Sequence, residues 1–301
     1  MREWDPEIEI DAERGRELIE TQFPELRGAE VRELAAGWDN VVHLVDERWA
    51  FRFPRRAIAV PGVHREIAVL PRLAGHLPLP IPEPHFIGVA TGGYPWPWFG
   101  ARFIPGTELA DSGLPDERRV ELGASLGRFL RALHDPGLAS SVGLSLPVDP
   151  NRRADMEFRV PATRRRLDEA ATAGLCQMTD ATERLLMAAA ALPAPRAVVL
   201  HGDLHARHVV VDANGLPTGV IDWGDVCAGD PSVDLSFAYG SLTGGARVAF
   251  LDAYGHVDQP TEVRARIIAT SLGVALLAYA ADRGMEALRA ESARALARAV
   301  D

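Results

Sequence analysis

The stretch that decides the fold is Val198-Val199-Leu200-His201-Gly202-Asp203-Leu204-His205-Ala206-Arg207-His208-Val209-Val210-Val211. Two short β-rich runs enclose a polar loop, from His201 to His208, that holds an aspartate and three histidines. An aspartate between glycine and leucine is by itself most often a turn residue. The residues after this loop decide whether Asp203 has a chemical role.

A hairpin comes next along the chain. Asn214-Gly215 separates two β-branched runs, and Asn-Gly in that position is the strongest short-range hairpin signal. The far arm of the hairpin ends in Ile221-Asp222-Trp223-Gly224-Asp225. We therefore expect the hairpin to bring Asp203, His208 and Asp222 close together at the mouth of a cleft. Phosphoryl transfer requires such a set, because one carboxylate orients the acceptor hydroxyl and other groups hold Mg²⁺ on the phosphates.

The first hundred residues are expected to form strands around one helix. Residues 41–45 and 49–53 are β-rich runs joined by a turn, and further strands are expected near 85–89 and 96–103. The apolar spacing over 63–73 predicts the helix. The proline-rich connection over 77–84 cannot be helical. Ile104-Pro105-Gly106-Thr107 then ends the sheet and is the best candidate for a hinge.

After the hinge the chain is expected to be helical. Residues 116–134 carry a buried apolar stripe, 152–192 form an arginine-rich helical region, and 267–281 are apolar on nearly every side. The last stretch is either a buried bundle helix or one wall of an acceptor pocket. Strands followed by helices predict an α+β fold with two lobes. The expected lobes are residues 1–103 and 108–301, with the hinge at about 102–107.

Composition narrows the class of protein. The formal net charge is −10, which argues against nucleic-acid binding and is compatible with a cationic substrate or with solubility alone. No signal-peptide core or apolar run of roughly 18–20 residues is evident, and Cys176 and Cys227 lack metal-ligand spacing. We expect a cytoplasmic protein that binds no membrane. All 32 basic residues are arginine, which a genome-wide coding bias would explain.

The loop with Asp203 and the run Ile221-Asp222-Trp223-Gly224 resemble the signature of the aminoglycoside and macrolide phosphotransferase family. That family has a fold similar to protein kinases. Trp49-Ala50-Phe51-Arg52 stands where the kinase strand motif V-A-I-K would be, and Leu126 to His134 resembles the helix after the hinge. The resemblance covers roughly residues 30–240 in order, and the last sixty residues are not diagnostic.

The resemblance implies roles for individual residues. Asp203 would be the catalytic base, and Asp222 with His208 would bind Mg²⁺. Arg52 would contact the nucleotide phosphates, paired with Glu66. The loop at Gly37 would cover the phosphates, and the hinge backbone would bind the purine edge. This hinge set is Arg102, Phe103 and Ile104, and Asp225 is a candidate for acceptor binding.

Two positions depart from the family pattern. His208 stands where asparagine is usual, and imidazole suits Mg²⁺ less well than oxygen does. The macrolide branch resembles this chain in having histidine there, which favours a bulky, partly apolar acceptor. Arg52 stands in place of lysine, but an arginine can bind phosphate through both nitrogens of its fork.

Several positions keep a structural alternative. His201 and His205 are expected to bond the backbone of their loop, and His208 could merely pack there. Glu66 could be a solvated surface residue. Asp230 and Asp234 are expected to cap or brace the helix that follows them. Trp96 and Trp98 are expected to pack in the core.

We predict a phosphotransferase that moves the γ-phosphate of ATP or GTP to a hydroxyl of a small molecule, with Mg²⁺ as cofactor. The acceptor is expected to be an antibiotic, either a macrolide or an aminoglycoside. One alternative is a metabolic kinase acting on an amino alcohol, a sugar or homoserine. Another is a pseudokinase that binds nucleotide without transferring phosphate. The sequence leaves open the acceptor, the choice of ATP over GTP and the oligomeric state.

Overall fold

A computed structural model describes residues 6–37, 39–189 and 197–301. The chain divides into two compact units, and neither is a single continuous stretch. The first unit consists of Met1–Gly75, Pro80–Ile104 and Asp222–Gly224. The second consists of His76–Leu79, Pro105–Ile221 and Asp225–Asp301. The three residues that come after the predicted hairpin therefore join the first unit, although they are distant from it in sequence.

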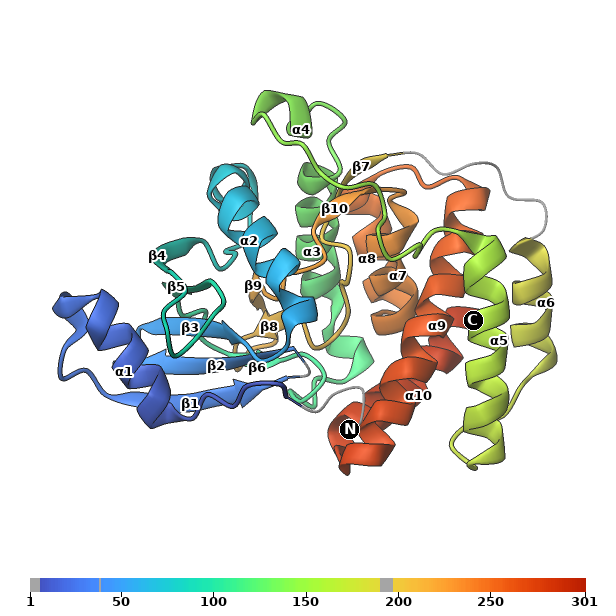
Figure 1. The fold of residues 1–301 in the computed structure, drawn as a ribbon. Coiled ribbons are helices and arrows are strands. Elements are labelled where there is room, and N and C mark those ends of the chain that lie inside the picture. Colours follow the sequence, from blue (N-terminus) through green and yellow to red (C-terminus); the bar gives the residue numbers. More distant parts are fainter. Residues whose placement is uncertain (1–5, 38, 190–196) are drawn as a thin grey trace. The chain divides into compact units, whose positions relative to one another are not determined.

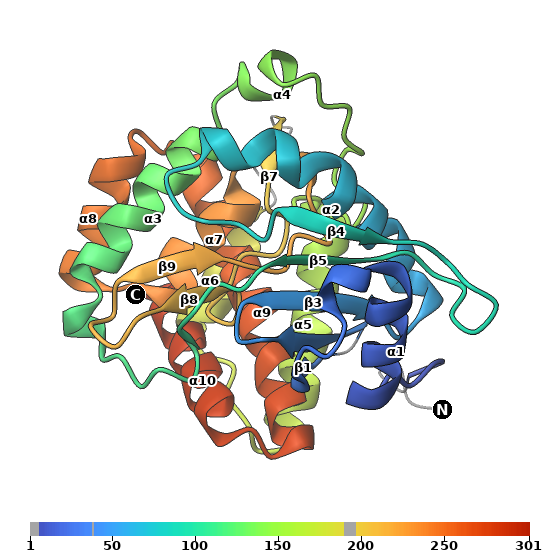
Figure 2. The same ribbon diagram turned by 90° about the vertical axis from the view of Figure 1, so that its left-hand side faces the viewer.

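A five-stranded antiparallel sheet forms the body of the first unit (Figures 1 and 2). Side chains alternate between the two faces of a strand, so Phe51 and Phe53 enter the core while Arg52 points to the other face. This alternation sets the position of the arginine expected to meet the phosphates. The strands, in spatial order, are β1 (Val31–Ala36), β2 (Asn40–Val45), β3 (Trp49–Pro54), β5 (Trp98–Arg102) and β4 (Pro84–Gly88).

Two α-helices, and not the single one expected, accompany this sheet. α1 (Ala12–Gln22) packs on β1, and the carboxylate of Asp11 caps its first turn by accepting from the Arg14 amide at 2.8 Å. Its apolar residues are too few to have indicated a helix. α2 (Val60–Leu73) begins three residues before the predicted start, because Pro61 is tolerated in a first turn. The short 3₁₀ turns are η1 (Pro24–Leu26), η2 (Ala57–Ala59) and η3 (Ala74–His76).

Aromatic rings fill the core of the first unit. Phe53 and Trp98 are fully buried and stack with ring centroids 4.7 Å apart. Phe51 and Phe86 stack at 5.4 Å. Trp96 is partly buried against the same cluster. The expectation that both tryptophans serve packing is confirmed, and this rigid core fixes the strand that carries Arg52.

The predicted hairpin is present in the second unit. β8 (Val209–Val211) pairs with β9 (Pro217–Val220), and β6 (Thr107–Glu108) adds a third strand. Asp212 closes the turn, because its Oδ1 accepts from the amides of Asn214 and Leu216, both at 2.9 Å. β7 (Val198–Leu200) pairs separately with β10 (Cys227–Gly229). The loop from His201 to His208 thus runs between strands of two different small sheets.

Helices make up most of the second unit (Figure 1). The arginine-rich region expected over 152–192 forms two helices with a break between them, and its last three residues lie outside the described part of the chain. The helices are α3 (Val120–Leu133), preceded by η4 (Asp116–Arg118), then α4 (Leu138–Ser141), α5 (Met156–Thr172), α6 (Asp180–Ala188), α7 (Ser232–Ser241), α8 (Gly244–Tyr254), α9 (Gln259–Arg283) and α10 (Glu286–Val300).

α9 is the central helix of this bundle and contacts α5, α7 and α10. By length and composition alone it is long and apolar enough to cross a membrane, which the sequence did not suggest. However, 61% of its most apolar stretch is buried inside the protein, as in a core helix. Together with α7 and α10 it lines a cavity of about 30 Å³ beside His205. Such a space holds roughly two water molecules, so it is too small for an antibiotic.

Buried charges fasten α10 to the bundle. Glu291 on α10 is 4% exposed and accepts from Arg119 at 2.7 Å and from Arg298 at 2.8 Å. Burial by itself would raise the pKa of Glu291, but the two guanidinium groups outweigh it and lower the pKa to about 2. Arg298 also reaches Asp116 at 2.5 Å. The C-terminal helix is therefore held by ionic as well as apolar contacts.

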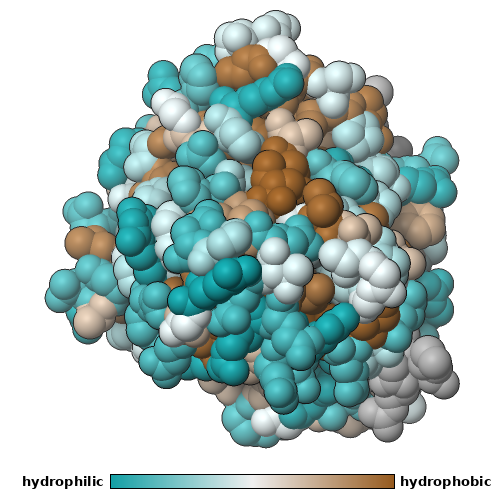
Figure 3. All heavy atoms as spheres, turned by 60° about the vertical axis from the view of Figure 1, so that its left-hand side comes forward, coloured by the Kyte–Doolittle hydropathy of each residue, from teal (hydrophilic) through white to brown (hydrophobic). Residues whose placement is uncertain are grey.

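Hydrophilic side chains cover most of the face drawn in Figure 3, and hydrophobic residues appear there in small separate groups. Large exposed hydrophobic residues in the described chain include Ile58, Val89, Val148 and Met187. Single exposed apolar residues of this kind are normal on protein surfaces. These exposed residues therefore do not by themselves indicate a binding site.

Candidate functional site

The loop with Asp203 is fixed from below by α7. Asp234 is fully buried, and its carboxylate accepts from the backbone amides of His201 at 2.7 Å and Gly202 at 2.9 Å. Gly202 has φ of +89°, and a Cβ atom there would lie 2.2 Å from the carbonyl oxygen of Asp225. Only glycine fits this turn. Asp234 was expected to brace its own helix, so its role at the loop is a correction.

His201 has the structural role predicted for it. Its Nε2 lies 2.9 Å from the carbonyl oxygen of Ile221, and its Nδ1 accepts from the amide of Asp203 at 3.2 Å. A carbonyl only accepts, so the proton lies on Nε2. Burial lowers the pKa of His201, which favours this neutral form. The ring ties the loop to the end of the hairpin.

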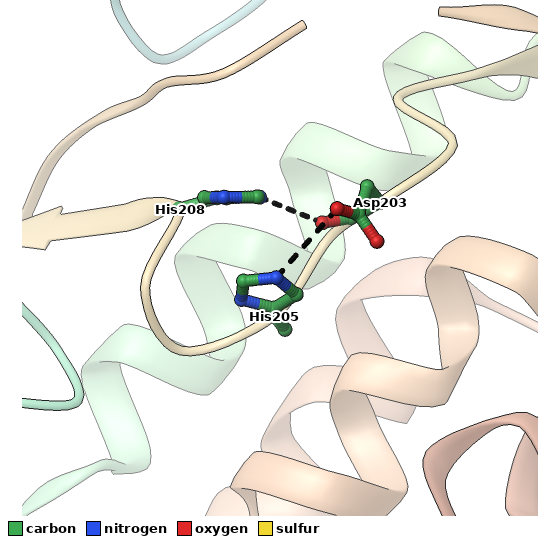
Figure 4. Close-up of side chains that lie close together, drawn as sticks. All are labelled: Asp203, His205 and His208. Carbon is green, nitrogen blue, oxygen red and sulfur yellow. Dashed lines mark hydrogen bonds and ion pairs between the residues drawn. The ribbon is translucent and has the colours of Figure 1, made fainter. Parts of the chain in front are cut away.

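His205 and His208 both lie beside Asp203 (Figure 4). Nδ1 of His208 donates to the backbone carbonyl of Asp203 at 2.8 Å, and its ring lies 3.9 Å from the ring of His205, centroid to centroid. Nε2 of His205 is 3.7 Å from the Asp203 carboxylate. His205 therefore serves the side chain of Asp203 as well as the loop backbone, from which its Nδ1 accepts the Arg207 amide at 3.3 Å.

These tautomers test whether the cluster fits a metal ion. Because His208 donates through Nδ1, its Nε2 carries the lone pair of the neutral ring and can bind a cation. His205 accepts through Nδ1, so its Nε2 carries the proton and faces Asp203 without a lone pair. His208 fits a metal-binding role, and His205 does not without a change of tautomer. Mg²⁺ would require oxygen atoms for its other ligands.

Arg153, which sequence analysis missed, contacts both carboxylates of this region. Its Nη1 lies 2.6 Å from Oδ1 of Asp203, and its Nη2 pairs with Oδ2 of Asp225. Burial by itself would raise the pKa of Asp203, but Arg153 and then His205 outweigh it and hold that pKa well below its usual range. Nothing in the sequence around Arg153 distinguishes it from other arginines that precede a helix, so only the fold reveals this contact.

The first unit holds the second polar cluster. Arg52 on β3 donates from Nη2 to Asp222 at 2.7 Å, and its Nη1 lies 3.2 Å from Oε1 of Glu66 on α2. With its amide oxygen turned toward the guanidinium, Asn40 accepts from Nη2 at 2.8 Å. Burial would lower the pKa of Arg52, but Asp222 and Glu66 raise it. The ion pair predicted between Arg52 and Glu66 is therefore present, and Arg52 makes a second one with Asp222 that was not predicted.

Glu66 is fully buried, so the alternative of a solvated surface residue is wrong. Its Oε1 also accepts from the backbone amide of Trp223 at 3.1 Å. Burial raises the pKa of Glu66 to about 7, against the opposing effect of Arg52. Glu66 thus links α2 both to the strand of Arg52 and to the segment after Asp222.

Asp222 itself has an unusual backbone conformation, with φ of +63°. A non-glycine residue in the left-handed region is costly and is concentrated at functional sites. Its side chain is 43% exposed, so it retains access to a ligand. Asp222 belongs to the first unit and Asp203 to the second. The expected proximity of Asp222 to Asp203 and His208 stays a prediction.

The loop between β1 and β2 is fastened to the end of β3. The Gly37 amide donates to the Asn40 carbonyl at 2.8 Å, and Arg55 donates from Nη1 to the Gly37 carbonyl at 3.0 Å. Asp39 accepts from Arg56 at 2.8 Å. Trp38, which was part of the predicted phosphate loop, lies outside the described residues.

The predicted purine-binding segment is at the end of β5. The Phe103 amide donates to the carbonyl of Arg48 at 2.8 Å, so in this arrangement it cannot donate to a purine. Arg102 is exposed and lies over the ring of Trp49, 5.0 Å from its centroid. Ile104 is the last residue of its part of the first unit. The purine contact of this segment is a prediction that now depends on Ile104 and on carbonyl groups.

Asp225 and Asp230 are both held by arginines of the second unit. The acceptor-binding role proposed for Asp225 is untested, and its carboxylate is paired with Arg153. Asp230 accepts from the Ser232 amide at the first residue of α7 at 3.0 Å and also pairs with Arg264 at 3.4 Å. It therefore braces the start of this helix, as expected, although the N-cap residue itself is Pro231.

Comparisons with known proteins find matches over more than half of the chain. A model of the phosphotransferase enzyme family matches residues 30–268. Viomycin phosphotransferase of Streptomyces vinaceus is 31% identical over 189 residues, which are 61% of this chain and 64% of that protein. The chain thus matches just under two thirds of the length of that curated relative.

Solved structures extend the comparison to nearly the whole chain. The GDP and kanamycin complex of APH(2")-IIia is 25% identical, with a TM-score of 0.68, and the match covers 94% of this chain and 97% of that one. Macrolide 2'-phosphotransferase type I is 20% identical, with a TM-score of 0.61 and coverage of 97% and 98%, a likeness that shows the fold alone. The predicted α+β, kinase-like fold is confirmed.

Proposed function

The chain belongs to the phosphotransferase enzyme family, and we propose that it transfers the γ-phosphate of a nucleoside triphosphate to a hydroxyl group of an antibiotic. Asp203 is the catalytic base, which orients the hydroxyl and accepts its proton as the bond to phosphorus forms. The observation that carries the proposal is the way the loop is built. Asp234, Gly202 and His201 fix its backbone, while the Asp203 carboxylate is left 25% exposed.

Arg52 and Glu66 support a nucleotide site in the first unit. In protein kinases, the corresponding lysine and glutamate must be paired for the phosphates to be held. Here the side chain of Arg52 is 14% exposed, is paired with Glu66 and Asp222, and carries a permanent charge. Asp222 and His208 would hold Mg²⁺, which would supply positive charge to the phosphates. The GDP complex among the similar structures supports a nucleotide donor, and ATP and GTP are both candidates.

An antibiotic acceptor is favoured over a metabolite by the relatives. Viomycin phosphotransferase is named for an antibiotic, and the 25% identical structure is a complex with kanamycin. The net charge of −10 suits cationic acceptors of this kind. The macrolide preference suggested by His208 remains an alternative within the same proposal. We also propose that the protein is cytoplasmic.

The pseudokinase alternative loses its main support. That alternative depended on Arg52 and His208, the two departures from the family pattern. Arg52 makes the expected ion pair with Glu66 and a further one with Asp222. In the neutral ring of His208, Nε2 is the unprotonated nitrogen, because Nδ1 donates to the Asp203 carbonyl.

The experiment is a phosphate-transfer assay with purified protein. ATP and GTP are each offered with viomycin, kanamycin, a macrolide, choline and homoserine, and the phosphorylated product is measured by mass spectrometry. We expect one of the antibiotics to be phosphorylated in a Mg²⁺-dependent reaction that Asp203→Asn abolishes. The exposed Asp252→Asn serves as the control variant. Phosphorylation of a metabolite alone, or full turnover by Asp203→Asn, would contradict the proposal.

A further inference from the structure

One guanidinium group joins two carboxylates beside the candidate catalytic base. Arg153 contacts Asp203 through Nη1 and Asp225 through Nη2, so the two terminal nitrogens of its fork are divided between two different partners. Its Nε is buried and has no hydrogen-bond partner in the described chain. The side-chain hydrogen bonds found for Arg153 in the described chain thus all go to these two carboxylates.

The backbone of Arg153 is fixed as firmly as its side chain. Asp149 accepts from the amides of Arg153 and Ala154, both at 2.8 Å, through its two carboxylate oxygens. Asp149 in turn donates its own amide to the carbonyl of Ala228 at 2.8 Å, on β10. Arg152 adopts φ of +49°, in the left-handed region, between these anchors. The backbone at Arg153 is therefore fixed by hydrogen bonds to Asp149, which is itself bonded to β10.

Charge explains why a cation is needed there. The side chains of Asp203 and Asp225 are 25% and 29% exposed, and Arg153 is 16% exposed. Without Arg153, the two partly buried carboxylates of Asp203 and Asp225 would repel each other, and both would repel an incoming phosphate group. With Arg153 between them, the net charge of the three side chains is −1 instead of −2. A planar fork can hold both carboxylates at once, which a lysine ammonium cannot do with the same geometry.

We propose that Arg153 is a positioning residue for phosphoryl transfer, which fixes the carboxylate of Asp203 relative to the acceptor hydroxyl and offsets its charge toward the phosphate. This inference rests on the proposed function. Arg153 engages only Oδ1 of Asp203, and Nε2 of His205 lies 3.7 Å from Oδ2, so Oδ2 keeps lone pairs that can accept the hydroxyl proton. Asp225 acts as the second anchor of the guanidinium.

A rival explanation makes the opposite prediction. Arg153 could occupy the place of a cationic group of the acceptor, in which case it must leave before the acceptor binds. Removing Arg153 would then improve the use of a cationic acceptor. The fixed backbone of Arg153 favours the positioning role, because a displaceable group does not require such anchoring.

The test compares Arg153→Ala and Arg153→Lys with the wild-type protein in the phosphate-transfer assay, using the acceptor that the wild type phosphorylates. Arg152→Ala is the matched control, because that neighbouring arginine is 57% exposed and pairs with Asp155. Thermal unfolding checks that each variant is folded. Guanidinium chloride is added at millimolar concentrations, far below those that denature proteins.

We expect Arg153→Ala to lower kcat by about 100-fold, the cost of misplacing a reacting group by about 1 Å, with little change in KM for the nucleotide. Arg153→Lys is expected to be more active than Arg153→Ala but less active than the wild type. Added guanidinium ion should raise the activity of Arg153→Ala several-fold and should not raise that of Arg152→Ala. Unchanged kcat in Arg153→Ala overturns the proposal. The proposal is also overturned if Arg153→Ala has a lower KM for the acceptor and is inhibited by guanidinium. These results are expected if Arg153 occupies the place of a cationic group of the acceptor.

The wild-type protein distinguishes the two proposals. If it phosphorylates no acceptor with either nucleotide, the proposed function fails. If it is active and Arg153→Ala is equally active, only the role of Arg153 fails.

Discussion

The carboxylate of Asp234 accepts a hydrogen bond from the backbone amide of His201 at 2.7 Å, joining the buried helix α7 to the loop of the candidate base. The same carboxylate accepts from the Gly202 amide at 2.9 Å and lies 3.2 Å from Nε2 of His134, the residue that follows α3. A single buried anion therefore fixes the backbone immediately before Asp203. No substrate needs to reach Asp234 for it to matter to the reaction.

Replacing Asp234 should damage both stability and turnover. Asp234→Ala leaves two buried amides without an acceptor, so we expect a loss of about 3 kcal/mol or more in the free energy of unfolding. Asp234→Asn keeps one acceptor oxygen and should lose less. Urea unfolding and the phosphate-transfer assay measure the two effects, with Asp252→Asn as an exposed control. An Asp234→Ala variant with wild-type stability and kcat would show that the loop is held in another way.

Gly202 offers a test of close packing at the same loop. Gly202 and Gly28 both have positive φ, +89° and +80°, but only at Gly202 would a Cβ atom meet a backbone atom, 2.2 Å away. Gly28→Ala should cost only the backbone strain, about 1–2 kcal/mol. Gly202→Ala adds a clash with Asp225 and should cost clearly more, and it should abolish turnover. Equal losses of stability in the two variants would mean that the loop relaxes around the added methyl group.

The elements that sequence could predict are those with local signals. The hairpin was predictable because Asn214-Gly215 fits a tight turn, and Arg52 and Glu66 were predictable because a known motif orders them along the chain. Asp234 gave a weaker signal that could have been used. It is the one charged residue of α7, a helix whose residues are all buried, and such a charge requires buried partners.

Other contacts had no local signal at all. Arg153 meets Asp203 across 50 residues of chain and is one of 32 arginines, none distinguishable by composition. α1 has a largely polar sequence and only three buried residues, so its apolar pattern was too sparse. The Phe103 amide is used by Arg48 because β3 and β5 are neighbours in the sheet, which depends on strand order.

The ion pairs of Glu291 predict how stability depends on pH. The pKa of this residue is about 2 in the folded protein and 4.5 ordinarily. Since the folded pKa is depressed, its contribution to stability is fully present above about pH 4.5 and is lost as the pH falls toward 2. At pH 7, Glu291→Gln should therefore cost about 3 kcal/mol, because Arg119 and Arg298 lose a buried partner.

Urea unfolding between pH 7 and pH 3 measures this effect. The difference between Glu291→Gln and the wild type should shrink as the pH falls below 4.5. Glu286→Gln is the control on the same helix, because Glu286 is exposed and its ion pair with Arg289 lies at the surface. A difference that stays constant down to pH 3 would show that packing of α10, and not the charge of Glu291, accounts for the loss.

His208 should determine which metal ion supports the reaction best. Its Nδ1 donates to the Asp203 carbonyl, so Nε2 is the nitrogen that would bind a metal ion, and imidazole binds Mn²⁺ more readily than Mg²⁺. His208→Asn supplies an oxygen in place of this nitrogen. We expect the variant to need less Mg²⁺ for half-maximal turnover, while the advantage of Mn²⁺ decreases. Titration of each metal in the phosphate-transfer assay measures both, and the exposed His256→Asn is the control. If His208→Asn leaves both titrations unchanged, His208 is not a metal ligand and serves only to hold the loop around Asp203.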